Sequence, residues 1–139
     1  MIISERVYYD ILEHLSDLEH ESGGILGGND GVINRFTLDE GRTHYSDKYI
    51  PNVILMNQKI DEWMKDGMEF YGMVHNHLTN EKRLSNEDVI YIKRIMTSMP
   101  AYIDKLYFPL VIPNHLMVPF TAQRNDNNIL LVNDILQII

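Results

Sequence analysis

A strand pattern that ends in two histidines constrains this chain more than any other feature of its sequence. Residues 69–74 have the pattern of a buried strand, and His75 and His77 follow directly. Alternate side chains of a strand lie on the same face of a sheet, so both imidazoles are expected to point the same way. The fold must therefore present two neighbouring imidazoles at the end of a central strand.

The next predicted element offers a third polar group. Ser85 is a favourable helix N-cap, and residues 86–96 have the apolar spacing of an amphipathic helix with Asp88 in its first turn. The end of the strand and the start of the helix can thus bring His75, His77 and Asp88 together. Two histidines and one carboxylate leave the fourth position of tetrahedral zinc open, which is typical of a catalytic zinc site. The pattern favours one Zn²⁺ per chain.

Each part of this pattern also has a simpler interpretation. A His-x-His sequence occurs by chance at exposed strand ends, and a serine three residues before an acid is a plain helix start that resembles a capping box. A further feature supports the metal site, because Glu21 lies just before the glycine-rich apolar stretch of residues 23–28. Zinc hydrolysis needs a carboxylate that shuttles protons without binding the metal, and Glu21 is the best candidate. Without the other residues, Glu21 would be interpreted as a solvated acid.

Taken together, these residues resemble the JAMM signature of the JAB/MPN-domain zinc metalloproteases. The signature has a glutamate before a glycine-containing strand, then His-x-His, ten residues and an aspartate, with a serine three residues before that aspartate. The resemblance extends from about residue 4 to about residue 122. It departs at Leu78, where the family usually has proline directly after the second histidine. This difference alters the rigidity of the loop and removes no ligand.

The resemblance implies a role for each residue of the signature. His75, His77 and Asp88 would bind Zn²⁺. Glu21 would deprotonate the attacking water and return a proton to the leaving amine, and Ser85 would hydrogen-bond the tetrahedral oxyanion. The fold that it implies is α/β, with a mixed, partly barrel-like β-sheet flanked by helices, as in JAB/MPN and cytidine-deaminase-like architectures.

The resemblance also implies a zinc-dependent peptidase or isopeptidase in a minimal, prokaryotic-type form. Its expected partner is a ubiquitin-like or sulfur-carrier protein whose flexible C-terminal tail lies extended beside the zinc and is cleaved after its terminal glycine. Such a reaction would serve deconjugation or precursor processing, and the tail could add as an extra strand at an open sheet edge. Two other classes stay open, which are a non-catalytic MPN-type scaffold and a protein-interaction module with incidental histidines.

Composition narrows the class of protein. The 139 residues have the length of one domain, and 45% of them are hydrophobic, which is a normal globular balance. No segment approaches the roughly 18 to 20 unbroken apolar residues of a membrane span, and residues 1–5 lack the start of a signal peptide, so a cytoplasmic location is expected. The absence of cysteine excludes disulfides, a thiol nucleophile and the zinc nucleobase deaminases, whose signature requires cysteines.

The charge of the chain argues against a nucleic-acid partner. The net charge is −8 and the pI is about 5.1, whereas phosphate binding needs clustered lysine and arginine. The acidic groups could steer a basic partner, although a solvated surface is the simpler interpretation. The glycines of residues 23–28 lack the frame of a phosphate loop, so they indicate close backbone packing.

The spacing of apolar residues and turn signals predicts a mixed α/β domain over residues 1–139. Ser4 is expected to cap a first helix that runs to about Glu19. A hairpin is expected around residues 29–31, and Gly67 is expected to end a second helix. The predicted helices span residues 4–19, 52–66 and 85–99, and the predicted strands span residues 23–28, 32–38, 43–45, 68–77, 105–112, 116–123, 129–132 and 135–139.

Overall fold

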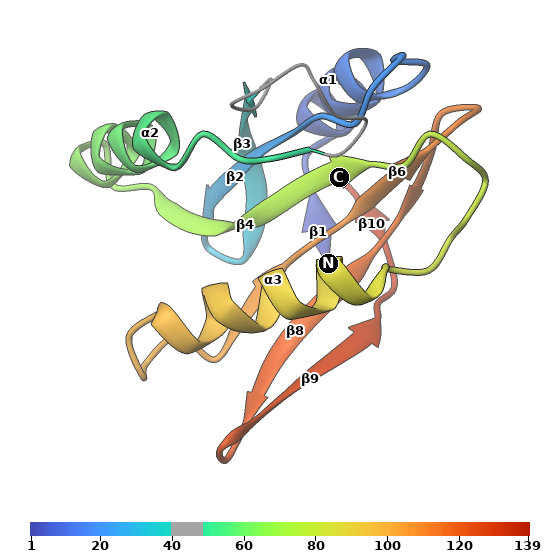
Figure 1. Cartoon of the computed structure of the whole chain (residues 1–139). Helices are drawn as coiled ribbons and strands as arrows, with labels where there is room; N and C mark the ends of the chain where they lie inside the picture. Colours follow the sequence, from blue (N-terminus) through green and yellow to red (C-terminus); the bar gives the residue numbers. More distant parts are fainter. Residues whose placement is uncertain (40–48) are drawn as a thin grey trace.

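A curled, mixed β-sheet flanked by helices forms the molecule in this computed structural model, which describes residues 1–39 and 49–139 (Figure 1). The predicted fold class is therefore confirmed. In chain order the described elements are β1 (Ile2–Ile3), α1 (Glu5–Leu15), β2 (Gly23–Asn29), β3 (Val32–Asp39), α2 (Val53–Lys65), β4 (Glu69–Asn76), α3 (Asn86–Ser98), β5 (Lys105–Tyr107), β6 (Leu110–Ile112), β7 (Leu116–Val118), β8 (Phe120–Asn125), β9 (Asn128–Asn133) and β10 (Gln137–Ile138).

The strand that carries the histidines lies at the centre of the sheet. The strand order is β10-β1-β3-β2-β4-β5-β8-β9, and β6 pairs with β4 and β7. β4 pairs antiparallel with β2, in a register that places Gly23 opposite His75, and parallel with both β5 and β6. The end of β4 therefore pairs with β2 on one side and with β6 on the other.

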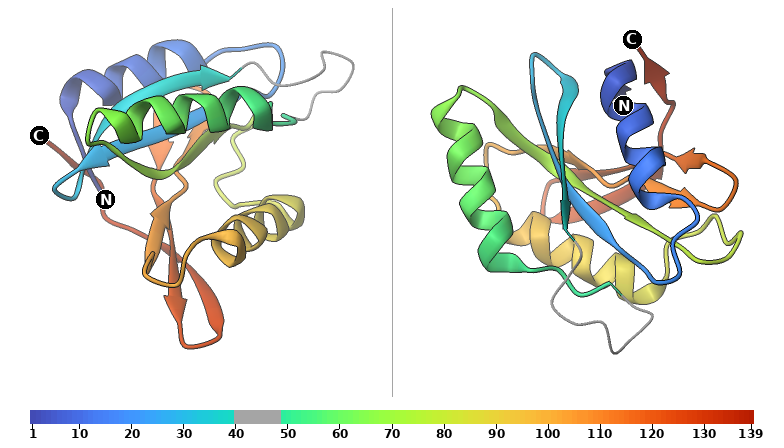
Figure 2. Two further views of the ribbon diagram at one scale, coloured as in Figure 1. Left: turned by 90° about the vertical axis from the view of Figure 1, so that its left-hand side faces the viewer. Right: turned by 90° about the horizontal axis from the view of Figure 1, so that it is seen from above.

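The two faces of the central strands bury different cores. Leu26 and Val74 pack in a cluster with α1, whereas Ile25 and Met73 pack in a cluster with residues of α2 and α3. In the right-hand view of Figure 2, α1 lies on one side of β2 and β3, and α2 lies on the other side. Sheet alternation therefore decides which side chains of β4 face α1 and which face the other two helices.

The first helix begins as predicted and ends earlier. Ser4 is its N-cap, but the helix stops at Leu15, so the prediction that it runs to Glu19 is wrong. Asp17 takes the left-handed conformation, with φ of 58°, and this conformation is a common way for a helix to end. Glu21 consequently lies in the segment that connects α1 to β2, and not at a helix end.

The other two helices and the first hairpin are confirmed. Asn52 caps α2, and Gly67 follows its end with φ of 77°, as a C-terminal glycine does. Ser85 caps α3. Asp30 and Gly31 both have left-handed φ values, as the turn of a tight β2–β3 hairpin requires. None of the helices in the described part of the chain has the length and apolar character of a membrane span.

The predicted strands of residues 105–112 and 116–123 are each divided in two. Pro109 and Pro119 lie at the breaks, and proline has no N–H to donate to a sheet. The divided pieces pair separately, β5 with β8 and β6 with β7. The short strand β1 was not predicted, and the predicted strand of residues 43–45 lies outside the described residues.

Close backbone packing explains the glycines of the central strands, as predicted. A Cβ atom on Gly27 would meet the ring of Trp63 at 2.6 Å. Gly72 has φ of 137°, and a Cβ atom there would collide with the carbonyl oxygen of Tyr107 in β5. Only glycine allows the two strands to approach at this point.

Candidate metal centre

The two histidines lie on the face of β4 that points toward α3. Along β4, alternate side chains lie on opposite faces, so His75 and His77 lie on the face of Met73, which packs in a cluster with residues of α3. The intervening Asn76 lies on the face of Val74, which is directed toward α1. β4 ends at Asn76, and His77 continues its direction because its N–H donates to the carbonyl of Val111 at 2.9 Å. The prediction that the histidines point the same way is therefore confirmed.

Asp88 completes a cluster that could hold a metal ion. The Nε2 atoms of His75 and His77 are 3.3 Å apart, and they lie 3.3 Å and 3.1 Å from the two carboxylate oxygens of Asp88. Tetrahedral zinc with bonds of roughly 2.0 to 2.1 Å holds its ligand atoms about 3.3 to 3.4 Å apart. The measured distances are close to that spacing, and the three side chains could hold a metal ion.

The loop after β4 selects the tautomer of His77. Its Nδ1 lies 3.1 Å from the carbonyl oxygen of Glu81, and a carbonyl only accepts, so Nδ1 carries the hydrogen. Nε2 of the neutral ring is then free to bind a metal. The Glu81 carboxylate accepts a hydrogen bond from Nε of Arg83, and the backbone N–H of Glu81 donates to the hydroxyl oxygen of Thr79. These contacts lie within the loop that begins at Leu78.

Asp88 also closes a capping box at the start of α3. Its Oδ2 accepts the N–H of Ser85 at 2.8 Å, and its own N–H donates to the Ser85 hydroxyl oxygen at 3.1 Å. The capping interpretation and the metal interpretation of this sequence are therefore compatible. The helix cap orients the carboxylate that faces the histidines.

The cluster favours an anionic Asp88. Burial raises the pKa of this carboxyl, but the imidazoles of His75 and His77 beside it and the hydrogen bond from the Ser85 N–H outweigh burial and hold the pKa well below its usual range. Burial lowers the pKa of His77, whereas its contacts with Asp88 and the Glu81 carbonyl raise it above the ordinary value. The Asp88 carboxylate therefore faces the Nε2 atoms of both histidines.

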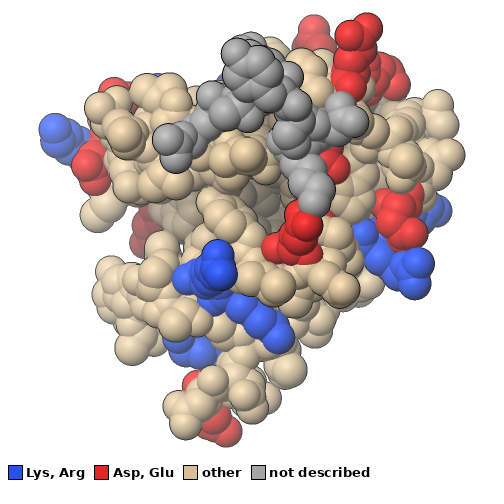
Figure 3. Space-filling model, in the orientation of Figure 1, with Lys and Arg blue, Asp and Glu red and all other residues tan. Residues whose placement is uncertain are grey.

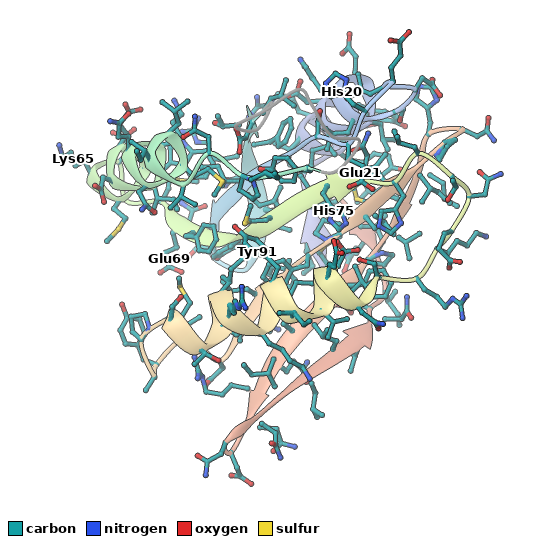
Figure 4. All side chains as sticks on the ribbon, viewed as in Figure 1. His20, Glu21, Lys65, Glu69, His75 and Tyr91 are labelled. Atoms are coloured by element: carbon teal, nitrogen blue, oxygen red, sulfur yellow. The ribbon has the colours of Figure 1, made fainter. Side chains whose placement is uncertain are left out.

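All five residues of the predicted site line one cavity of about 690 Å³. Residues at the end of β4, in the loop after it and in α3 line this cavity, together with residues 49–51, and Figure 3 shows the molecule hollowed above α3. Buried apolar side chains, among them Met73 and Ile92, form part of its wall. Figure 4 shows Glu21 and His75 together near the end of β4. The structure thus gathers residues that are up to 67 positions apart, from Glu21 to Asp88.

Glu21 and Ser85 reach the cavity without joining the ligand cluster. The Glu21 carboxylate accepts the N–H of Tyr49 at 3.3 Å, and its charge contributes to the raised pKa of His77. The Ser85 oxygen accepts the capping hydrogen bond, and a hydroxyl that accepts can still donate its own hydrogen. Both residues therefore line the same cavity as the cluster.

Comparison with known proteins bears on the fold. No protein-family model and no curated protein matches the chain. Among solved structures, the JAB1/MPN domain protein AF2198 from Archaeoglobus fulgidus is similar, with a TM-score of 0.57 and 19% identity over 100% of this chain and 99% of that one. This chain has a JAB1/MPN-like fold.

Two further structures share the JAB1/MPN-like fold of this chain. Protein DSY2949 from Desulfitobacterium hafniense has a TM-score of 0.68 at 21% identity, covering 100% of this chain and 94% of that one. A protein from Salinibacter ruber has a TM-score of 0.57 at 16% identity, covering 99% and 91%. At such identities the likeness concerns the fold, so activity must be argued from the site.

Tyr49, Asp39 and Asn76 support this site and were not predicted from the sequence. Tyr49 donates its hydroxyl to Asp39 at 2.6 Å, and Asp39 also accepts the N–H of Asn52 at 2.9 Å. Burial, followed by the contact with Asp39, raises the pKa of Tyr49 far above its ordinary value. Asn76 is buried between the two histidines. A polar residue inside a buried strand was the available signal for Asn76.

Proposed function

We propose that this protein is a zinc-dependent peptidase or isopeptidase of JAMM type. The observation that carries the proposal is the shared cavity, in which a carboxylate and a hydroxyl outside the cluster accompany three side chains that could hold a metal ion. His75, His77 and Asp88 would hold the ion. When bound, zinc lowers the pKa of a coordinated water from about 15.7 to about 7 and polarises a carbonyl.

The remaining two residues would supply the proton transfers and the charge stabilisation. The Glu21 carboxylate would orient the attacking water, take its proton, and later give that proton to the leaving nitrogen. The Ser85 hydroxyl would donate to the carbonyl oxygen as negative charge develops on it. The apolar part of the cavity wall strengthens both interactions, because charges interact more strongly where water is excluded.

The proposed substrate is a ubiquitin-like or sulfur-carrier protein with a flexible C-terminal tail that ends in glycine. Within the described residues β4 pairs with strands on both sides, so a substrate tail cannot add to the sheet as a new strand beside β4. The tail would instead lie in the cavity, where glycine has no side chain to obstruct the approach of its carbonyl to the ligands. The bond broken would join that glycine to a lysine amine or a peptide N-terminus.

A cleavage panel tests this proposal. The zinc-loaded protein is incubated with ubiquitin-like and sulfur-carrier fusions, and the products are identified by mass spectrometry. Cleavage directly after the terminal glycine is the expected result, with chelation abolishing it. Cleavage only within unstructured peptides would indicate a general peptidase, and stoichiometric zinc without any cleavage would favour a scaffold.

A further inference from the structure

Asn76 lies between the two histidines and points away from them. It is 2% exposed, and its side chain faces α1 on the opposite side of β4. Its amide makes no contact with the ligand cluster. A buried amide at this place must be satisfied by hydrogen bonds, because burying it unpaired would cost about 1 to 3 kcal/mol.

The Asn76 side chain replaces one rung of the β2–β4 ladder. The backbone N–H of Asn76 donates to the carbonyl of Ser22 at 3.1 Å, and the side-chain Oδ1 of Asn76 accepts the N–H of Ser22 at 2.6 Å. In an ordinary antiparallel pair the backbone carbonyl would accept that second hydrogen bond. The chain therefore leaves the ladder at Ser22, and the residue immediately before it is Glu21.

The same side chain also holds the end of α1. Its Nδ2 donates to the carbonyl of Leu15 at 3.1 Å, which is among the last carbonyls of the helix and has no partner within it. Asn76 thus ties down both ends of the segment from Leu15 to Ser22. Glu21 lies on this segment and beside one of its two anchors.

We propose that Asn76 is a positioning residue, which holds Glu21 in place relative to the metal ligands. The inference rests on the proposed function, in which Glu21 moves protons. An amide is suited to this task because it offers a donor and an acceptor together. The same strand end thereby presents two ligands on one face and fixes the general base from the other face.

Two variants with a matched control test this inference. Asn76→Ala removes both side-chain hydrogen bonds, and Asn76→Asp keeps the acceptor for Ser22 but loses the donor to Leu15. Asn34→Ala is the control, since its amide donates to Asn29 on the same hairpin at 2.8 Å without lining the cavity. All three should bind zinc stoichiometrically, because no ligand is changed.

The kinetic readout separates positioning from general destabilisation. Asn76→Ala should lower kcat by roughly 10- to 100-fold with little change in KM, because a displacement of about 1 Å can cost this much. The control should stay near the parent. In a Glu21→Gln background most of the Asn76→Ala effect should disappear, because both changes act on one group. An undiminished loss in that background would overturn the inference.

A crystallographic readout does not depend on activity. In zinc-loaded crystals of Asn76→Ala, or of Asn76→Asp if the alanine variant does not fold, the Glu21 carboxylate should leave its parent position while His75, His77 and Asp88 keep theirs. An unmoved Glu21 would overturn the inference. If the parent cleaves no substrate, the proposed function fails, and this structural comparison still decides whether Asn76 positions Glu21.

Discussion

The metal-site cluster is compact, because the Nε2 atoms of His75 and His77 and the carboxylate oxygens of Asp88 lie 3.1 to 3.3 Å apart. By contrast, Glu21 and Ser85 line the same cavity outside that cluster. The ligands come from the end of β4 and the first turn of α3, which are regular elements. Glu21 comes from a connecting segment that hydrogen bonds from Asn76 hold in place. In the proposed function, metal binding and proton transfer therefore depend on different parts of the fold, so mutations should separate them.

The largest expected effect is the loss of metal in Asp88→Asn. The amide keeps the size of the side chain and an oxygen for the helix cap, but it removes the negative charge. We expect zinc affinity to fall by more than the roughly 10- to 100-fold that loss of a supporting hydrogen bond costs. Competition with a chelator measures this change, and thermal unfolding of the metal-free proteins is the control. Parent-like zinc affinity would remove Asp88 from the ligand set.

The next effect concerns Glu21 and should leave the metal in place. Glu21→Gln keeps the volume and most hydrogen bonding of the side chain, so zinc content and the fold should be retained. The rate of cleavage should fall by roughly 10²- to 10⁴-fold with the loss of a general base. Single-turnover cleavage and elemental analysis are measured on both proteins. Loss of zinc in this variant would show that Glu21 is a ligand. A cleavage rate within about threefold of the parent's rate is a far smaller change than a general-base effect and would exclude Glu21 from the mechanism.

Ser85 belongs to both parts of the comparison, because it caps α3 and lines the cavity. Ser85→Ala should lower the free energy of unfolding by about 0.5 to 2 kcal/mol, whereas glycine at an N-cap costs only a few tenths. Both Ser85→Ala and Ser85→Gly lose the hydroxyl donor, so both should lose roughly 10²- to 10³-fold in kcat if that donor stabilises the oxyanion. Restored turnover in the glycine variant would show that helix capping alone matters.

The smallest effect is expected at Arg83. Its contact with Glu81 is exposed to solvent, and exposed ion pairs contribute roughly 0 to 1 kcal/mol. The Glu81 carbonyl that orients His77 is not removed by Arg83→Ala, so zinc affinity should fall by less than about tenfold, below the usual range for a supporting partner. Isothermal titration with zinc tests this expectation. A larger loss would show that the loop of residues 78–84 controls the ligand geometry.

Local signals predicted the elements that are stabilised locally. Ser85 and Asp88 cap α3 through contacts three residues apart, and Asp30 and Gly31 supply the left-handed turn of the first hairpin. The division of residues 105–123 into four strands was not predicted. Pro109 and Pro119 were the local signals for the breaks, whereas the pairing of the pieces, β5 with β8 and β6 with β4 and β7, depends on the tertiary structure.

The sequence by itself determined the ligand types and placed His75 and His77 on one face, because alternation along a strand is a property of the backbone. It also determined the helix cap that orients Asp88. Only the tertiary structure decided that Glu21 lies in the cavity and that Asn76 bonds Leu15 and Ser22, which are 61 and 54 positions away. Such contacts follow from how the sheet and helices pack, and no local pattern of residues encodes that packing.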